Sequence, residues 1–107
     1  MTARPSAGYL YIVLGDVQYF EEALRSVHSL KTHDPEGHAT LVTDTRGAAH
    51  PGLRDSFDDV VVRTMPEAND TWRQAKVFKV EQLRCSPYEQ TLFIDSDTLF
   101  LANCRCL

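Results

Sequence analysis

The sequence has no long block of basic residues and no apolar stretch long enough to span a membrane. Its 107 residues include 11 Lys and Arg against 15 Asp and Glu, for a net charge of −4. Because binding to a nucleic-acid backbone depends on clustered positive charge, we expect no nucleic-acid partner. The longest apolar run, residues 9–14, has six residues, which is too short for a membrane span or for the core of a secretory signal. We therefore expect no membrane segment and, by default, a cytoplasmic location.

Cysteine is also scarce. Cys85, Cys104 and Cys106 are an odd number of cysteines, which argues against a disulfide framework. The C-x-C pair lacks the further Cys or His ligands of a zinc site, so we expect free, reduced thiols. Apolar residues make up 43% of the chain and charged residues 24%, which is typical of a soluble globular domain with one core.

The chain does contain an alternation of strand and helix patterns. Residues 1–8 predict a flexible tail, and residues 9–107 predict one α/β domain. Short apolar runs bounded by turn residues predict strands at residues 8–15, 39–44, 59–65 and 90–95. Apolar residues at helical spacing predict helices at residues 17–31 and 71–84, with Asp16 and Asn69 or Asp70 suited to cap them. Residues 46–57 predict a loop with at most one helical turn.

This alternation is typical of a Rossmann-like parallel sheet of four strands with flanking helices. Right-handed crossovers favour the spatial order 3-2-1-4, which makes the first and fourth strands neighbours and reverses the winding between them. Ligands of open α/β sheets bind at the carboxyl ends of the strands beside such a reversal. Gly15 and Asp16 end the first predicted strand and Asp95 ends the fourth, so we expect them on the ligand side of the sheet.

Asp95 and Asp97 directly follow the apolar residues 91–94. In an extended segment, residues two apart point to the same side, with Cα atoms about 6.7 Å apart. Both carboxylates can then converge on one cation, and oxygen ligands suit Mn²⁺ or Mg²⁺. The cation would offset the repulsion between the two charges. A D-x-D motif alone equally fits a strand that ends in solvent-exposed acids. The apolar residues 99–101 just after the pair favour a ligand-binding site over a solvated loop.

Several segments, in their order and spacing, resemble the amino-terminal half of GT-A glycosyltransferases, especially the glycogenin and bacterial galactosyltransferase-like group. In that group, an apolar strand is followed by the motif D-x-D-T-L, then by a pair of apolar residues and an Asn. The segment FIDSDTLFLAN is similar to this pattern. Upstream, YIVLGDVQYFEEALRSVHSLKTH resembles its first strand and helix, LVTD its second strand, and SFDDVVV the entry to its third. WRQAKVFKVEQL resembles the helix that carries a lysine ahead of D-x-D. The similarity spans residues 9–104.

The resemblance implies half of a GT-A nucleotide-diphospho-sugar transferase fold. It implies metal-dependent transfer of a hexosyl group from a nucleotide-sugar, commonly a UDP-sugar, with Mn²⁺ or Mg²⁺ on the diphosphate. Asp95 and Asp97 would bind the metal, and Asp95 would also face the ribose.

The resemblance also implies a set of donor-binding residues. Tyr19 would stack near the base, with Gly15 and Asp16 beside it, and Ser96 would contact the donor. Lys79 matches the lysine that approaches the donor's phosphate or sugar. As residues alone, Lys79 and Tyr19 also fit simpler roles, as a lysine whose stem covers apolar neighbours and as an aromatic at the rim of the core.

The resemblance ends after Asn103, where the chain continues as Cys104-Arg105-Cys106-Leu107. The family's second half supplies the acceptor site and further catalytic groups. We therefore expect a domain that is incomplete at its carboxyl end and inactive alone, unless a missing half or another subunit of a homo-oligomer completes it.

Two other interpretations stay open. The chain could be a non-catalytic remnant or interaction module, which would bind neither metal nor nucleotide. A phosphatase of the haloacid dehalogenase type also has an apolar strand followed by D-x-D and Thr. That motif opens its domain, however, whereas only ten residues follow Asp97 here.

Overall fold

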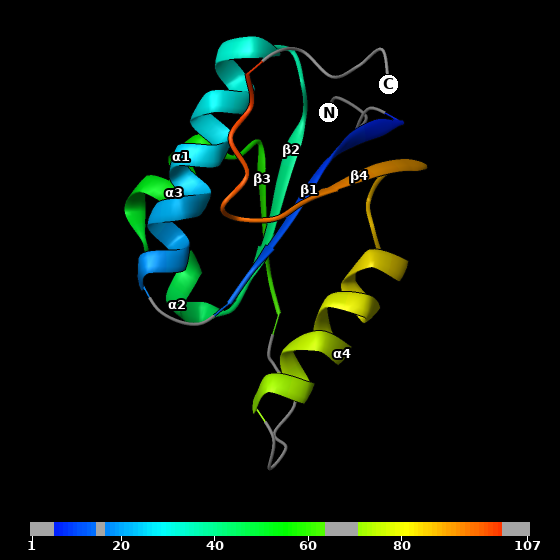
Figure 1. The fold of residues 1–107 in the computed structure, drawn as a ribbon. Coiled ribbons are helices and arrows are strands. Elements are labelled where there is room, and N and C mark those ends of the chain that lie inside the picture. Colours follow the sequence, from blue (N-terminus) through cyan, green and yellow to red (C-terminus); the bar gives the residue numbers. More distant parts are fainter. Residues whose placement is uncertain (1–5, 15–16, 64–70, 102–107) are drawn as a thin grey trace.

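The structure, a computed structural model, describes residues 6–14, 17–63 and 71–101, with the side chains of residues 71–75 left out. Strands and helices alternate along the chain (Figure 1). The elements are β1 (Ala7–Val13), α1 (Val17–His33), β2 (Ala39–Thr43), α2 (Thr45–Ala48), α3 (Pro51–Ser56), β3 (Asp59–Val62), α4 (Thr71–Arg84) and β4 (Gln90–Ile94).

The four strands form one parallel sheet in the order β3-β2-β1-β4, as the alternation predicts. In register, Tyr11 of β1 lies beside Leu41 of β2 and Ile94 of β4. Helices α1, α2 and α3 lie on one side of the sheet and α4 lies on the other (Figure 1). The fold is therefore an α/β sheet covered on both faces, with β1 and β4 adjacent at the reversal of winding.

Strand β1 is at the centre of the core because both of its faces are covered. Tyr9, Tyr11 and Val13 point toward α1 and α3 and pack with Phe20 and other buried residues there. The alternate residues of β1 pack on the other face with Val42 and with Phe78 of α4. Each such large apolar side chain contributes about 1.5–3 kcal/mol when fully buried. This explains why β1 is an unbroken apolar run rather than an alternating one.

Two hydrogen bonds fix α1, and Asp34 directly after it, onto β1. The Tyr9 hydroxyl donates to Asp34 Oδ2 at 2.8 Å, and the Tyr11 hydroxyl lies 2.7 Å from Ser26 Oγ. Both polar partners are buried. Because a buried polar group without a partner is costly, these pairs favour one position of the helix over the strand.

The amino ends of β1, β2 and β4 are joined by Tyr88, which precedes β4. Its hydroxyl lies 2.5 Å from His38 Nδ1 and 2.7 Å from Thr40 Oγ1. Its ring packs directly over Gly8, where a Cβ would stand 2.3 Å from ring atoms. Gly8 is required here by this close approach, which lets β4 start beside β1.

The structure differs from the sequence predictions between β2 and β3. Two short helices, α2 and α3, replace the predicted loop or single turn. Asp44 caps α2 through bonds to the Arg46 and Gly47 amides, and Pro51 opens α3. Strand β1 begins at Ala7, within the predicted tail. The predicted caps Asp16, Asn69 and Asp70 lie outside the described residues.

Candidate functional site

The candidate site follows the carboxyl end of β4, which lies beside β1 and ends two residues before β1 does. Ile94, the last residue of β4, pairs with Tyr11, and β1 runs on to Val13. Asp95 therefore follows β4 at the level of the last residues of β1. The predicted neighbours Gly15 and Asp16 lie outside the described residues, so their roles stay predictions.

Residues 95–98 form a turn, which we call the 95–98 turn. The Thr98 amide donates to the Asp95 carbonyl oxygen at 3.0 Å. The expectation of an extended D-x-D segment is therefore wrong, and alternation along a strand does not fix the directions of the two carboxylates. Asp95 and Asp97 are both exposed, and Ser96 between them is half-buried. Within the described residues, neither carboxylate is paired with a cationic side chain.

The turn is anchored on both sides. Before it, Ile94 is buried in the core that faces α1. After it, the chain returns along α1 (Figure 1), and the Phe100 amide donates to Ser29 Oγ at 2.9 Å. The Phe100 ring packs edge-on against Tyr9, with centroids 5.8 Å apart. Of the apolar residues after D-x-D, Phe100 is thus the buried one, and Leu99 and Leu101 are exposed.

Two other predicted residues lie on the helices that flank β1. Tyr19 is in the first turn of α1 and is 41% exposed, while its neighbour Phe20 enters the core. Lys79 follows the buried Phe78 on α4 and is half-buried. Since α1 and α4 cover opposite faces of the sheet (Figure 1), these two side chains come from opposite sides of β1. An aromatic side chain that is exposed this much in the first turn of a helix is available to stack on a ligand.

Asp44 and Arg46 are polar residues at the end of β2 that the sequence analysis did not select. Asp44 Oδ1 accepts from the Arg46 and Gly47 amides at 3.1 and 3.2 Å, and the Arg46 guanidinium donates to Asp44 Oδ2 at 3.2 Å. Thr43 Oγ1 donates to the Val13 carbonyl at 2.8 Å and so ties the ends of β1 and β2 together. The sequence could have indicated Asp44 only as the N-cap of a short helix, which is a structural role.

The described residues fit a cation only in part. No group of three or more His, Cys, Asp or Glu side chains gathers in the described part of the chain. Asp95 and Asp97 offer carboxylate oxygens, which suit Mg²⁺ or Mn²⁺. Mg²⁺ in particular is often held by one or two carboxylates together with substrate phosphates. The pair therefore fits a cation that arrives with a phosphorylated ligand better than one caged by protein alone.

Comparison with known proteins does not identify a family. No model of a known protein family matches the chain, and no curated protein sequence matches it significantly. In the described residues, the helices are too short or too polar to cross a bilayer.

Proposed function

We propose that this chain is the donor-binding portion of a metal-dependent glycosyltransferase that takes a UDP-sugar, with Mn²⁺ or Mg²⁺ as cofactor and a cytoplasmic location. The observation that supports the proposal most is the position of Asp95 and Asp97. They are exposed on an anchored turn at the carboxyl end of β4, whose last residue pairs with Tyr11 of β1. Open α/β sheets bind their ligands at this edge.

The proposal explains why two acids stand together at this edge. Two neighbouring carboxylates repel, and a divalent cation with the diphosphate of the donor would neutralise both. Asp95 and Asp97 would hold the ion, and the phosphate oxygens would complete its coordination. When bound, the ion would offset the negative charge that develops on the departing nucleoside diphosphate.

The remaining residues have binding roles in this proposal. Tyr19, exposed in the first turn of α1, would stack on the base, with Gly15 and Asp16 beside it. Lys79 would attract the phosphates, and Ser96 would contact the donor from the 95–98 turn. We expect little turnover from these 107 residues alone, because the resemblance covers only the donor-binding half.

The second candidate is a non-catalytic module, and two features of the described residues agree with it. The D-x-D segment is a turn rather than an extended strand end, and no third ligand gathers near by in the described residues. This alternative predicts that neither UDP nor Mn²⁺ binds. The haloacid dehalogenase interpretation has no such support, because the acids here follow the fourth strand of the sheet.

Isothermal titration calorimetry with UDP, in the presence and absence of MnCl₂, separates these candidates. We expect UDP to bind when Mn²⁺ is present and to bind much more weakly without it. The double variant Asp95→Asn, Asp97→Asn should weaken binding at least about tenfold, the loss of about 1.4 kcal/mol. Asp55→Asn, which removes an exposed acid from α3, should leave binding unchanged. Absence of UDP binding, or equal binding by the double variant, would contradict the proposal.

A further inference from the structure

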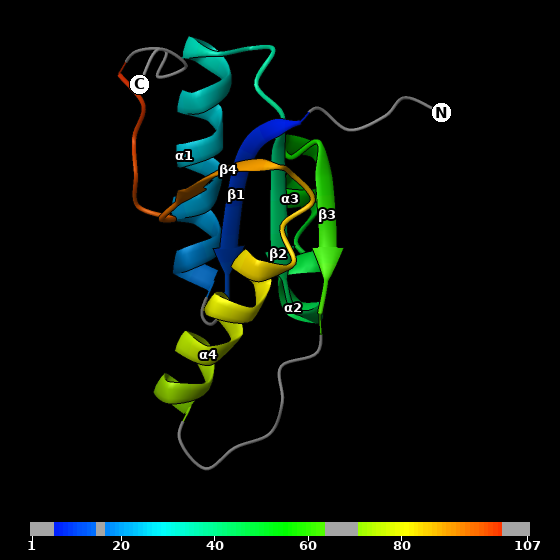
Figure 2. The same cartoon turned by 90° about the vertical axis from the view of Figure 1, so that its right-hand side faces the viewer.

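We propose that the outer edge of β3 is a self-association surface, on which β3 of a second copy of the chain docks in antiparallel orientation. Strand β3 is the edge strand of the sheet on the side of β2 (Figure 2). From β3 the chain continues to α4 and then to β4, which pairs with β1 at the other side of the sheet. The inference is based on the backbone of β3 and on its order of charges, and it is independent of nucleotide binding.

The backbone of β3 directs hydrogen-bonding groups away from the sheet. In the described part of the chain, β3 pairs with β2 alone, in a regular register from Asp59 to Val62. The Arg63 amide donates to the Thr43 carbonyl at 2.9 Å, on the β2 side. Because N–H groups alternate along a strand, the N–H and C=O groups of Val60 and Val62 point away from β2. An edge of this kind is a template for another strand.

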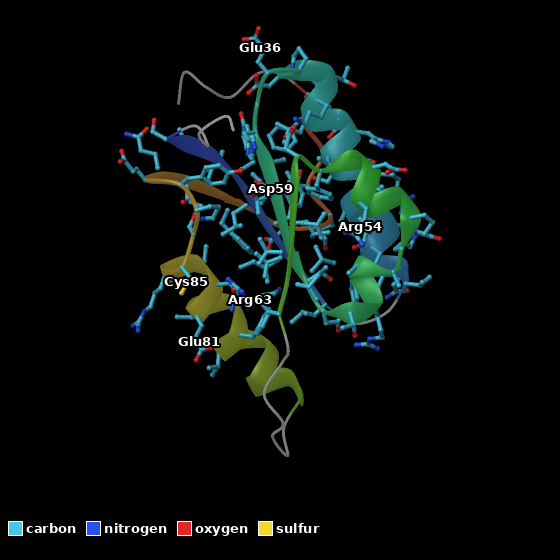
Figure 3. The ribbon with its side chains drawn as sticks, turned by 180° about the vertical axis from the view of Figure 1, so that it is seen from behind. Glu36, Arg54, Asp59, Arg63, Glu81 and Cys85 are labelled. Carbon is cyan, nitrogen blue, oxygen red and sulfur yellow. The ribbon has the colours of Figure 1, made fainter. Side chains whose placement is uncertain are left out.

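The side chains of this edge are apolar in the middle and oppositely charged at the two ends. Val61 packs with the core residues that face α4, and Asp59 and Arg63 share its face because each is two residues away. On the other face, Val60 packs with the core residues beneath α1, and Val62 is 44% exposed. Figure 3 looks onto this edge, with Asp59 and Arg63 at its opposite ends. The edge therefore reads Asp-Val-Val-Val-Arg.

This sequence is complementary to itself in an antiparallel pair. Opposite residues in such a pair share a face, so a two-fold axis passes between a residue and its own copy. With the axis at Val61, Asp59 of each copy lies opposite Arg63 of the other, a favourable cross-strand pair. The same register places Val60 opposite Val62, and because both direct their backbone groups outward, they form hydrogen-bonded pairs. With the axis at Val60 or Val62, a charged residue would instead lie opposite Val61.

A second copy is the partner that this order of charges selects. Charges on an edge strand usually oppose association, because an added strand sets apolar or like-charged side chains against them. A second β3 in antiparallel orientation instead brings the exposed Arg63 of each copy to Asp59 of the other. Asp59 Oδ2 lies 4.0 Å from His38 Nε2, and the guanidinium would join the imidazole beside this carboxylate. The same patch therefore serves both copies, as in a closed two-fold dimer.

Sedimentation equilibrium under reducing conditions, from micromolar to millimolar protein, tests the proposal. Because an edge this short is a small interface, we expect a weak monomer–dimer equilibrium. Arg63→Glu places like charges opposite each other at both ends of the pair and should raise the dimer dissociation constant about tenfold or more. Arg25→Glu makes the same change of charge at an exposed position of α1 and should leave the constant unchanged. The double variant Asp59→Lys, Arg63→Glu exchanges the two charges and should restore dimerisation.

A monomer at every concentration, an assembly larger than a dimer, equal effects of Arg63→Glu and Arg25→Glu, or a double variant that dimerises as weakly as Arg63→Glu would overturn the proposal. If the double variant loses its native circular dichroism, the wild-type chain decides the question by amide hydrogen exchange. The Val60 and Val62 amides should be better protected at high protein concentration than at low, whereas protection of the Val61 amide, which points toward β2, should not change. Protection of Val60 and Val62 that does not depend on concentration would contradict a docked second copy.

Discussion

Gly8 shows how a single residue decides where β4 begins. A Cβ at this position would stand 2.3 Å from the ring atoms of Tyr88, and that ring is held by hydrogen bonds to His38 and Thr40. The ring therefore cannot move aside without loss of buried bonds.

We predict that Gly8→Ala destabilises the protein by about 1–3 kcal/mol, the usual range for overpacking. Urea unfolding followed by circular dichroism measures the change. Ala7→Gly changes an exposed neighbour in the same strand and should cost about 1 kcal/mol or less. A Gly8→Ala variant as stable as the wild type would contradict the packing described.

Asp58 links α1 to the amino end of β2. Burial raises the pKa of its carboxyl, but hydrogen bonds from Lys31 and the Ala39 amide, with the positive charges of Lys31 and His38, outweigh burial and lower the pKa below 3.8. The Lys31 ammonium and the Ala39 amide are 2.5 and 2.8 Å from Asp58 Oδ2.

Because the pKa of Asp58 is lowered in the folded protein, its carboxylate stabilises the fold to the full extent at pH values above the ordinary pKa of 3.8. That stabilisation is lost as the pH falls through the lower, folded pKa. We predict that Asp58→Asn is less stable than the wild type at pH 7 and that the difference shrinks below about pH 4. Urea unfolding across this range measures it, with Asp55→Asn as control. A difference that stays constant with pH would refute the assignment.

At the scale of elements, the 95–98 turn depends on Phe100. The ring is 9% exposed and packs against Tyr9, and the Phe100 amide is bonded to Ser29. The 95–98 turn lies between this contact and the last residue of β4. Loss of the contact would therefore release the carboxyl end of the turn.

We predict that Phe100→Ala lowers the free energy of unfolding by about 3 kcal/mol, the lower end of the range for truncation of a buried aromatic residue to Ala. It should also weaken UDP binding in the presence of Mn²⁺, if the turn is the cation site. Leu99→Ala, at an exposed neighbour, is the matched control and should change neither quantity measurably. Equal stabilities of the two variants in urea would show that Phe100 does not anchor the segment.

Elements with a strong local pattern could be predicted from the sequence, and short ones could not. The apolar run of β1 and the helical spacing in α1 indicated both elements correctly. Helices α2 and α3 have four and six residues, too few for a periodic pattern to be visible. The 95–98 turn was also missed, because its shape is set by a contact between Phe100 and residues of β1 and α1 that are distant in sequence.

At the scale of the whole molecule, the sheet order could be predicted because few topologies satisfy strand–helix alternation with right-handed crossovers. That order makes β4 the neighbour of β1, with Ile94 paired to Tyr11, so the sequence predicted that Asp95 and Asp97 follow the strand next to β1. The directions of the carboxylates could not be predicted, because they depend on the turn. Gly15 and Asp16 lie outside the described residues, and the binding role of every proposed site residue stays a prediction from sequence.

The central claim is that a divalent cation at the carboxyl edge of this sheet holds the diphosphate of a nucleotide. Nuclear magnetic resonance with Mn²⁺ tests it directly, because the paramagnetic ion broadens the signals of nearby amides. With UDP present, substoichiometric Mn²⁺ should broaden the amides of residues 95–98 and of the end of β1, and Mg²⁺ should not. The amides around Asp58 and Asp59, at the opposite end of the sheet, should stay sharp. Broadening centred on those residues instead, or no broadening at residues 95–98, would contradict the account.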